Sequence, residues 1–148
     1  MSHSFASVFG IGHIPIASGS WASLLAVSVY YIFLSSQPLL QIIILIALVS
    51  LGGLIASNVA IPNKSSDPKY IVIDEVIGMW ITCLFIPTSI WWFVMAFLIF
   101  RILDITKLPP INLLEKLHGG LGILADDIGA GLIGGALLFL ASKVIILG

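Results

Sequence analysis

Long apolar stretches alternate with short polar segments along the whole chain. Five apolar stretches stand out, at residues 21–36, 38–60, 71–87, 90–104 and 127–147. The second carries no charged residue, whereas the third and fourth are shorter than the roughly 20 residues that a helix needs to cross a bilayer. This pattern predicts an all-α fold, an integral membrane helical bundle with about five membrane segments, some of them short.

The polar segments contain residues that favour turns and loops. Residues 61–70 hold two prolines, and residues 105–125 hold Pro109-Pro110 and a glycine pair. A Lys/Arg-rich start is absent from residues 1–20, so we expect the first apolar stretch to stay as a membrane segment rather than to be cleaved as a signal peptide. We see no internal repeat, and we expect a single membrane domain over residues 1–148.

The composition restricts the class of protein. Of the 148 residues, 59% are hydrophobic and only 9% are charged, and the mean hydropathy is +1.19. A soluble domain carries about 25% charged residues, and a chain this short leaves much of its surface exposed. These values exclude a soluble monomer. Six Lys and Arg against seven Asp and Glu give no basic field for nucleic acid. The single Cys83 excludes a disulfide framework.

The few charged residues gather on one side of the predicted bundle. With five crossings, the N-terminal segment, residues 61–75 and residues 101–127 share that side, whereas Trp91 and Trp92 lie at an opposite turn. The positive-inside rule makes the charged side cytoplasmic. We therefore expect a multi-pass membrane protein whose charged side faces the cytoplasm. The residues on this side are Lys64, Lys69, Arg101, Lys107 and Lys116, with the acids Asp67, Asp74, Glu75, Asp104, Glu115, Asp126 and Asp127.

Two adjacent carboxylates, Asp74 and Glu75, open the third apolar stretch. Ionised groups inside a membrane segment are costly and usually mark a functional site. A divalent cation is a suitable partner for several such groups. The alternative is that both acids lie at the level of the lipid headgroups, where acids suit the positive end of a helix dipole.

A glycine-rich segment precedes a second pair of carboxylates. Gly120 and Gly122 read as a loop that leads to a helix start, where bare backbone N–H groups can hold a phosphate oxygen. Asp126 and Asp127 follow, and hard oxygen ligands of this kind suit Mg²⁺. The alternative is an ordinary aspartate cap after a flexible loop.

Arg101, Asp104 and Lys107 end the fourth stretch at intervals of three residues. If the helix continues, they lie near one face. Arginine binds phosphate with two parallel hydrogen bonds, and lysine supplies a point charge. Asp104 would orient Arg101 or join the metal. The alternative is a positively charged stop signal with one salt bridge.

Residues 9–20 read as a flexible polar loop. Its Gly-x-Gly follows no predicted strand, so a dinucleotide-binding fold is not supported. His13 is a candidate to bind the substrate phosphate or to act as an acid or base, and an ordinary loop histidine is the alternative. His118 reads as an ordinary residue, and Asp67 as either a solvated residue or a mobile ligand.

Together and in this order, these motifs resemble the phosphatidylglycerophosphatase A family. The resemblance lies in residues 9–24 (FGIGHIPIASGSWASL), 71–80 (IVIDEVIGMW), 100–111 (FRILDITKLPPI) and 118–131 (HGGLGILADDIGAG). It implies a single membrane phosphatase domain that requires Mg²⁺ and converts phosphatidylglycerophosphate to phosphatidylglycerol and phosphate in glycerophospholipid biosynthesis. The implied partners are this lipid substrate and the bilayer. The implied location is the bacterial cytoplasmic (inner) membrane, with the active site facing the cytoplasm.

The resemblance also implies roles for individual residues. The catalytic carboxylates would be Asp74, Glu75, Asp104, Asp126 and Asp127, with Asp74, Glu75, Asp126 and Asp127 on the metal. Arg101 and Lys107 would hold the substrate phosphate, with Gly120, Gly122 and His13 added from the residue patterns above. The chain departs from the family in two places: Ala17-Ser18-Gly19-Ser20 replaces the usual A-P-G-T, and Lys107-Leu108-Pro109-Pro110-Ile111 replaces K-P-x-P-I. Both changes spare charged groups and bear on loop rigidity.

Several alternatives stay open at this point. We favour direct attack by water over an aspartyl-phosphate because no Asp-x-Asp motif occurs, and Asp126 or Asp127 would take the proton of the water. A small membrane cation transporter is the main alternative, although it would place ionisable groups near the midplane. A scaffold subunit would leave the one-sided carboxylates unexplained, and the signature of a CDP-alcohol phosphatidyl transferase is missing. The glycines of residues 129–135 permit close helix packing, within a protomer or across a homodimer.

Overall fold

The computed structural model describes residues 2–60, 70–114, 117 and 120–147, and the regular elements within them are helical. The prediction of an all-α fold is therefore confirmed for this part of the chain. The elements are α1 (Ser2–Ala6), the 3₁₀ turn η1 (Ile11–His13), α2 (Ser18–Val29), the π-helical turn η2 (Tyr30–Leu34), α3 (Leu39–Ala60), α4 (Ile73–Cys83), α5 (Ile90–Thr106), α6 (Ile111–Leu114) and α7 (Gly120–Leu147).

Each of the five predicted apolar stretches overlaps one of the helices α2, α3, α4, α5 and α7, but two starts were misplaced. α2 begins at Ser18, so part of the expected N-terminal loop is helical. α7 begins at Gly120, and the expected glycine-rich loop before Asp126 is therefore wrong for Gly120 and Gly122. Glycine weakens a helix by only about 1 kcal/mol per residue, and the apolar side chain of Leu124 is buried against the other helices. Packing therefore extends the helix through the glycines.

Two helices in the described part of the chain are long and apolar enough to cross a bilayer. Their spanning windows are Leu39–Ala56 in α3 and Leu121–Ile145 in α7. The helical stretch Ser18–Leu34 is apolar but shorter. Length and composition thus support two spanning helices, and the expected number of about five membrane segments stays a prediction.

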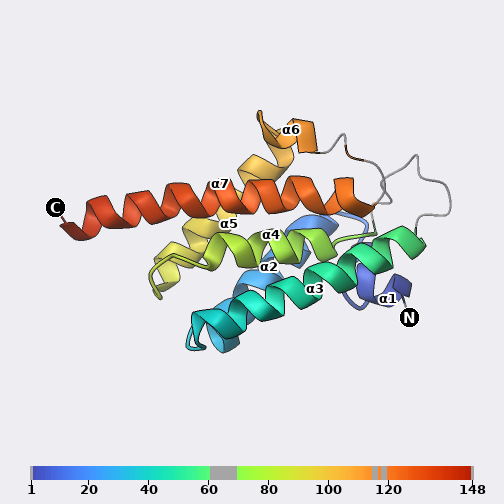
Figure 1. Cartoon of the computed structure of the whole chain (residues 1–148), viewed down its shortest axis with the longest axis horizontal. Helices are drawn as coiled ribbons and strands as arrows, with labels where there is room; N and C mark the ends of the chain where they lie inside the picture. The colour runs from blue at the N-terminus through green and yellow to red at the C-terminus, as the bar shows by residue number, and fades with distance from the viewer. Residues whose placement is uncertain (1, 61–69, 115–116, 118–119, 148) are drawn as a thin grey trace.

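The short helix α4 occupies the centre of the bundle. Figure 1 shows α7 along the longest axis of the molecule, with α4 and α3 beside it and α2 and α5 behind them. Ten of the eleven residues of α4 are buried. Eleven residues make a helix of about 16 Å, much shorter than the roughly 30 Å of a bilayer core. The first turn of α4, which carries Asp74 and Glu75, is therefore enclosed by other helices.

α4 and α7 run in the same direction and touch through glycines. A Cβ atom on Gly131 of α7 would overlap the backbone carbonyl of Gly78 in α4, and a Cβ on Gly78 would overlap the carbonyl of Asp127. Only glycine permits two helix backbones to approach this closely. The glycines of α7 thus pack within the protomer, and this contact places Asp127 beside the start of α4.

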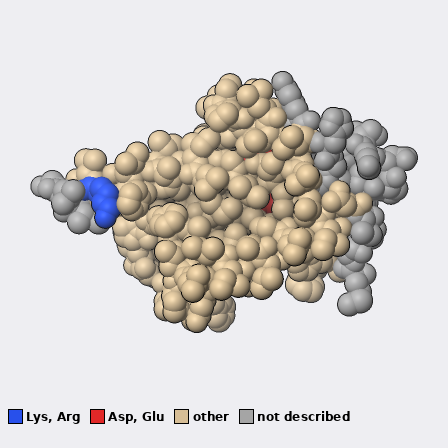
Figure 2. All heavy atoms as spheres, in the orientation of Figure 1, with Lys and Arg blue, Asp and Glu red and all other residues tan. Residues whose placement is uncertain are grey.

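The surface of the bundle is largely apolar. The face shown in Figure 2 carries one small red area in a hollow and one blue area at the C-terminal end of α7, and its other described residues are uncharged. Large side chains such as Leu40 and Leu48 of α3 and Leu140 of α7 are more than half exposed. Apolar surface of this extent is unusual for a soluble monomer and marks a surface that contacts lipid or protein.

Candidate active site

A polar cavity of about 630 Å³ lies where the N-terminal segment, the starts of α2 and α4, the end of α5 and the first turns of α7 meet. These segments were predicted to share one side of the bundle, and the structure confirms that they share one end. The cavity brings together five carboxylates and two cationic side chains. These residues are Asp74, Glu75, Arg101, Asp104, Lys107, Asp126 and Asp127.

Three of the carboxylates form a compact group. One oxygen each from Asp74, Glu75 and Asp127 lies within 4.8 Å of the others. Asp74 and Asp127 are 8% and 3% exposed, so water screens their charges poorly. The first turn of α4 supplies two of these residues, and α7 supplies the third through the glycine contact described above.

The donor set of this group fits a divalent cation of the Mg²⁺ type. Crowding several carboxylates in a buried site is unfavourable unless a cation compensates their charge. Oε2 of Glu75 is buried and accepts no hydrogen bond from the described residues, which leaves it available to a ligand. Mg²⁺ prefers carboxylate oxygens and is commonly held by one or two of them together with substrate phosphate. Asp74, Glu75 and Asp127 are therefore the residues that could hold this ion.

Asp126 faces a different partner. Nζ of Lys107 donates a hydrogen bond to Oδ2 of Asp126 at 2.6 Å, and the two side chains are 29% and 7% exposed. Lys107 follows the last residue of α5 in a left-handed conformation, which ends the helix. Oδ1 of Asp126 is buried, and no hydrogen bond to it occurs in the described structure. Of the four predicted metal ligands, the structure thus groups three and pairs the fourth with Lys107.

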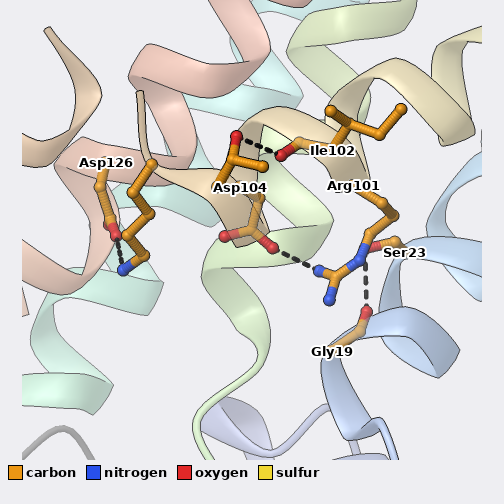
Figure 3. A network of polar contacts seen from close by, with 8 residues as sticks. Gly19, Ser23, Arg101, Ile102, Asp104 and Asp126 are labelled. Carbon is orange, nitrogen blue, oxygen red and sulfur yellow. Dashed lines mark hydrogen bonds and ion pairs between the residues drawn. The ribbon is translucent and has the colours of Figure 1, made fainter. Parts of the chain in front are cut away.

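Arg101 and Asp104 form an ion pair along α5, with Nη1 of Arg101 donating to Oδ2 of Asp104 at 2.5 Å. The predicted spacing of three residues places both on the side of α5 that lines the cavity. Figure 3 shows the guanidinium group lying between Asp104 and the start of α2. Nε of Arg101 is buried and has no hydrogen-bond partner among the described residues. The pair fixes the direction of the guanidinium and leaves part of its donor capacity unused.

The start of α2 makes room for these groups at Gly19. A Cβ atom at this position would overlap the carboxylate of Glu75 and would lie 3.2 Å from Nη1 of Arg101. The carbonyl of Gly19 accepts a hydrogen bond from Ser23 Oγ at 2.9 Å, within the first turns of α2 (Figure 3). The motif Ser18-Gly19-Ser20 therefore matters because position 19 has no side chain, whereas its sequence pattern indicated only part of a flexible loop.

The N-terminal segment forms one wall of the cavity. The ring of His13 stacks on Tyr70, with 5.7 Å between ring centroids and an interplanar angle of 12°. The backbone N–H of Val72 donates to the carbonyl of Ala6 at 2.9 Å, which fastens this segment beside the start of α4. Tyr70 was not among the predicted site residues, because a tyrosine at the edge of an apolar stretch carries no signal of chemistry. His13 lines the cavity, and its role there stays a prediction.

Some predicted residues lie elsewhere. Gly120 and Gly122 are helical, and their role in binding phosphate stays a prediction. Asp67 and His118 lie outside the described residues, as do Lys64, Lys69, Glu115 and Lys116.

Comparisons with known proteins agree on one family. A family model described as Phosphatidylglycerophosphatase A matches residues 4–142. A relative named "Phosphatidylglycerophosphatase A" from Escherichia coli (strain K12) is 37% identical over 139 residues, which cover 93% of this chain and 81% of the relative. A relative of the same name from Haemophilus influenzae is 36% identical over 129 residues, which cover 85% of this chain and 79% of the relative.

A third relative carries a different name. The protein from Bacteroides thetaiotaomicron named "Putative phosphatidylinositol-3-phosphatase" is 33% identical over 144 residues, which cover 93% of this chain and 91% of the relative. No solved structure matches the chain. The family model and the relatives extend over nearly the full length of the chain, including the segments that supply the cavity. The chain therefore belongs to the phosphatidylglycerophosphatase A family.

Proposed function

We propose that this protein is a Mg²⁺-dependent phosphatidylglycerophosphatase that releases phosphate from phosphatidylglycerophosphate and leaves phosphatidylglycerol in the membrane. One observation carries the proposal: three carboxylates, two further acids and two cations converge in a single cavity from helices α4, α5 and α7. The names of the relatives support the substrate. This combination suits a phosphomonoester, which carries nearly two negative charges at neutral pH.

Asp74, Glu75 and Asp127 would hold the Mg²⁺ ion, since their oxygens form the compact group. When bound, Mg²⁺ supplies neutralisation of the phosphate charge and lowers the pKa of bound water. The chain itself supplies the position of the three carboxylates, because the glycine contact between α4 and α7 holds them together before substrate arrives.

Arg101 and Lys107 bind the phosphate oxygens. Arg101 lines the cavity, its Nε has no hydrogen-bond partner among the described residues, and Asp104 keeps the group in one orientation. Lys107 reaches the same cavity from the end of α5. In phosphoryl transfer, most of the catalysis comes from positioning the phosphate group and from stabilising charge on its oxygens. Arg101 and Lys107 contribute to both effects.

Asp126 accepts the proton of the attacking water. It stands apart from the compact group and is held in place by the hydrogen bond from Lys107. Its buried Oδ1 has no hydrogen-bond partner among the described residues, so its acceptor capacity is unused. The water oxygen joins phosphorus, the bond from phosphorus to the glycerol oxygen breaks, and the proton reaches the leaving oxygen through solvent. We propose direct attack by water, without a phosphorylated aspartate.

The reaction takes place at the cytoplasmic surface of the membrane. The apolar windows of α3 and α7 and the exposed leucines support insertion in a bilayer. The charged cavity lies at one end of the bundle, so a lipid keeps its chains in the bilayer while its phosphate enters the cavity. Arg101 and Lys107 lie at that end, and five of the six Lys and Arg residues fall in the segments that the sequence assigns to that side, which supports a cytoplasmic orientation.

Phosphate release by the purified full-length protein tests the proposal. We expect release from phosphatidylglycerophosphate with Mg²⁺, and loss of release when EDTA removes divalent ions or when Asp127→Asn removes one charge of the compact group. Glu115→Gln is the matched control, since it makes the same chemical change at an acid with no assigned role. Activity that persists without divalent metal contradicts the proposed ion, and a phosphoprotein trapped by acid quench contradicts direct attack by water.

A parallel measurement with phosphatidylinositol 3-phosphate tests which lipid headgroup the protein prefers. The name of the Bacteroides thetaiotaomicron relative suggests this second substrate, and both lipids present a phosphomonoester on a polyol. We expect a higher kcat/KM for phosphatidylglycerophosphate, and the reverse order would overturn the proposed substrate.

A further inference from the structure

The polar cavity has two kinds of wall. Helices α4 and α7, and α5 with the Lys107 that follows it, supply the five carboxylates and the two cationic side chains. The other wall consists of residues 12–15 and 17 of the N-terminal segment and of residues 70 and 71, which precede α4. These residues, which we call the N-terminal wall, include no carboxylate. Among them, His13 is the residue whose side chain can carry a positive charge.

The N-terminal wall is fixed against the start of α4. The hydrogen bond from Val72 to Ala6 joins the two segments, and a Cβ atom on Gly12 would overlap the backbone carbonyl of Tyr70. The two backbones are therefore in direct contact at Gly12. The next residue, His13, is the last of η1, and its ring stacks on Tyr70. Because Tyr70 comes four residues before Asp74, this stack holds the imidazole in a fixed place relative to the carboxylates of α4.

The stack with Tyr70 uses a face of the imidazole ring and leaves its edge. Both ring nitrogens lie on that edge, and at least one of them carries a hydrogen in either protonation state. His13 is exposed, whereas Asp74 and Asp127 of the same cavity are buried. The imidazole is therefore a hydrogen-bond donor near the rim of the cavity, and the compact group of carboxylates lies deeper in it.

The charge of the cavity decides where a second anionic group can lie. Five carboxylates against two cationic side chains give a formal charge of −3. A divalent cation offsets the two charges of a bound phosphomonoester, so the excess of negative charge stays. A further anionic group is repelled by the carboxylates and is favoured beside a donor that stands apart from them. Among the described lining residues, the N-terminal wall with His13 meets both conditions.

The proposed substrate carries such a second anionic group. In phosphatidylglycerophosphate, a phosphodiester with one negative charge joins the glycerol that bears the terminal phosphate to the diacylglycerol. About six bonds of roughly 1.5 Å separate the two phosphorus atoms, which lie at most about 8 Å apart, whereas a sphere with the volume of the cavity is about 11 Å across. Both phosphates therefore fit in the cavity, with the phosphodiester toward the rim and the lipid chains outside.

We propose that His13 binds the phosphodiester of the lipid headgroup while the terminal phosphate lies at the carboxylates. The inference rests on the proposed function and names the part of the substrate that the N-terminal wall recognises. Tyr70 has a positioning role, since its ring fixes the plane of the imidazole. A lipid whose phosphomonoester is attached directly to diacylglycerol has no phosphodiester and gains nothing from this contact. His13 thus favours substrates with two phosphates.

An analogue of phosphatidylglycerophosphate with an uncharged methylphosphonate in place of the phosphodiester tests the inference, because it keeps the length and the terminal phosphate. The purified full-length protein and its variants are assayed on both lipids. We expect His13→Ala to lower kcat/KM for phosphatidylglycerophosphate about tenfold, mainly through KM, and to change it less than about twofold for the analogue. His13→Gln keeps a donor and should recover part of the loss. His118→Ala, the same kind of change at a histidine with no assigned role, is the matched control and should equal wild type.

Tyr70→Leu removes the stack but keeps the imidazole. We expect it to raise KM for phosphatidylglycerophosphate by a smaller factor than His13→Ala does, with kcat and the kinetics of the analogue unchanged. A loss of kcat on both lipids would contradict the positioning role of Tyr70.

Two results would overturn the phosphodiester site. One is an effect of His13→Ala that is equal on the two lipids or absent on both. The other is a wild-type protein that hydrolyses the analogue as well as phosphatidylglycerophosphate. If wild type releases phosphate from neither lipid, the proposed function itself fails. Because His13 is exposed, His13→Ala should keep the thermal midpoint of unfolding of wild type, so a selective rise in KM reports binding and not the fold.

Discussion

The substitution Gly19→Ala adds one methyl group at the most crowded point of the active site. Its Cβ would overlap the Glu75 carboxylate and lie 3.2 Å from Nη1 of Arg101. Both groups belong to the proposed machinery, one on the metal and one on the phosphate. Glu75 must therefore move, and the neighbouring Arg101–Asp104 pair must adjust with it.

Two effects of this substitution have opposite signs. Alanine stabilises the interior of a helix by about 1 kcal/mol relative to glycine, so the free energy of unfolding should change little or rise slightly. A displacement of about 1 Å in a reacting geometry costs about 100-fold in rate. We therefore expect kcat/KM for phosphate release to fall about 100-fold while the thermal midpoint of unfolding stays within a few degrees of wild type.

Phosphate release and thermal unfolding of the same purified sample separate the two effects. Gly52→Ala in α3 is the matched control, because its Cβ would meet only the ring of Phe5, at 3.2 Å. We expect that variant to keep wild-type activity. Activity of Gly19→Ala within twofold of wild type would refute the placement of Glu75 against α2, and a large fall in the thermal midpoint would show that the methyl group disrupts the fold instead.

Three further substitutions test other parts of the site and the fold. Arg101→Lys keeps the charge but loses the paired donors of the guanidinium, so kcat/KM should fall about tenfold or more. Retained activity would contradict a phosphate-binding role. Lys107→Met leaves the buried Asp126 carboxylate without its Lys107 partner and should lower the thermal midpoint of unfolding. A double-mutant cycle with Asp126→Asn should show a coupling energy of about 1–3 kcal/mol, and zero coupling would contradict the ion pair. Gly131→Val forces α7 away from α4 and should cost about 1–3 kcal/mol of stability, whereas Gly134→Ala, whose Cβ has ordinary contacts at 3.4 Å and beyond, should be close to neutral in thermal unfolding.

The sequence predicted the helices and most of the residues that line the site, because both depend on local sequence pattern. Apolar stretches bounded by prolines, glycines and charges locate α3 and α5 to within a few residues. The alternation of loops then places Asp74 and Asp127 at the same end of the bundle, although they are 53 residues apart. The spacing of Arg101 and Asp104 also predicts their contact.

The remaining features depend on packing between distant segments. Whether Gly120 and Gly122 are loop or helix is decided by contacts of α7 with its neighbours, and local propensity favoured the wrong answer. The partition of the carboxylates, with Asp126 on Lys107 and Asp127 in the compact group, follows from the direction of two adjacent side chains on a helix. No sequence pattern records the space that Gly19 leaves for Glu75.

Binding of Mn²⁺ to the purified protein tests most directly whether carboxylates from α4 and α7 form one metal site. Mn²⁺ prefers the same oxygen ligands as Mg²⁺, and electron paramagnetic resonance reports the fraction that is bound. We expect saturable binding that Mg²⁺ competes away and that both Glu75→Gln and Asp127→Asn weaken at least tenfold, with Glu115→Gln unchanged. Binding that is equally strong in all three variants would contradict a shared site.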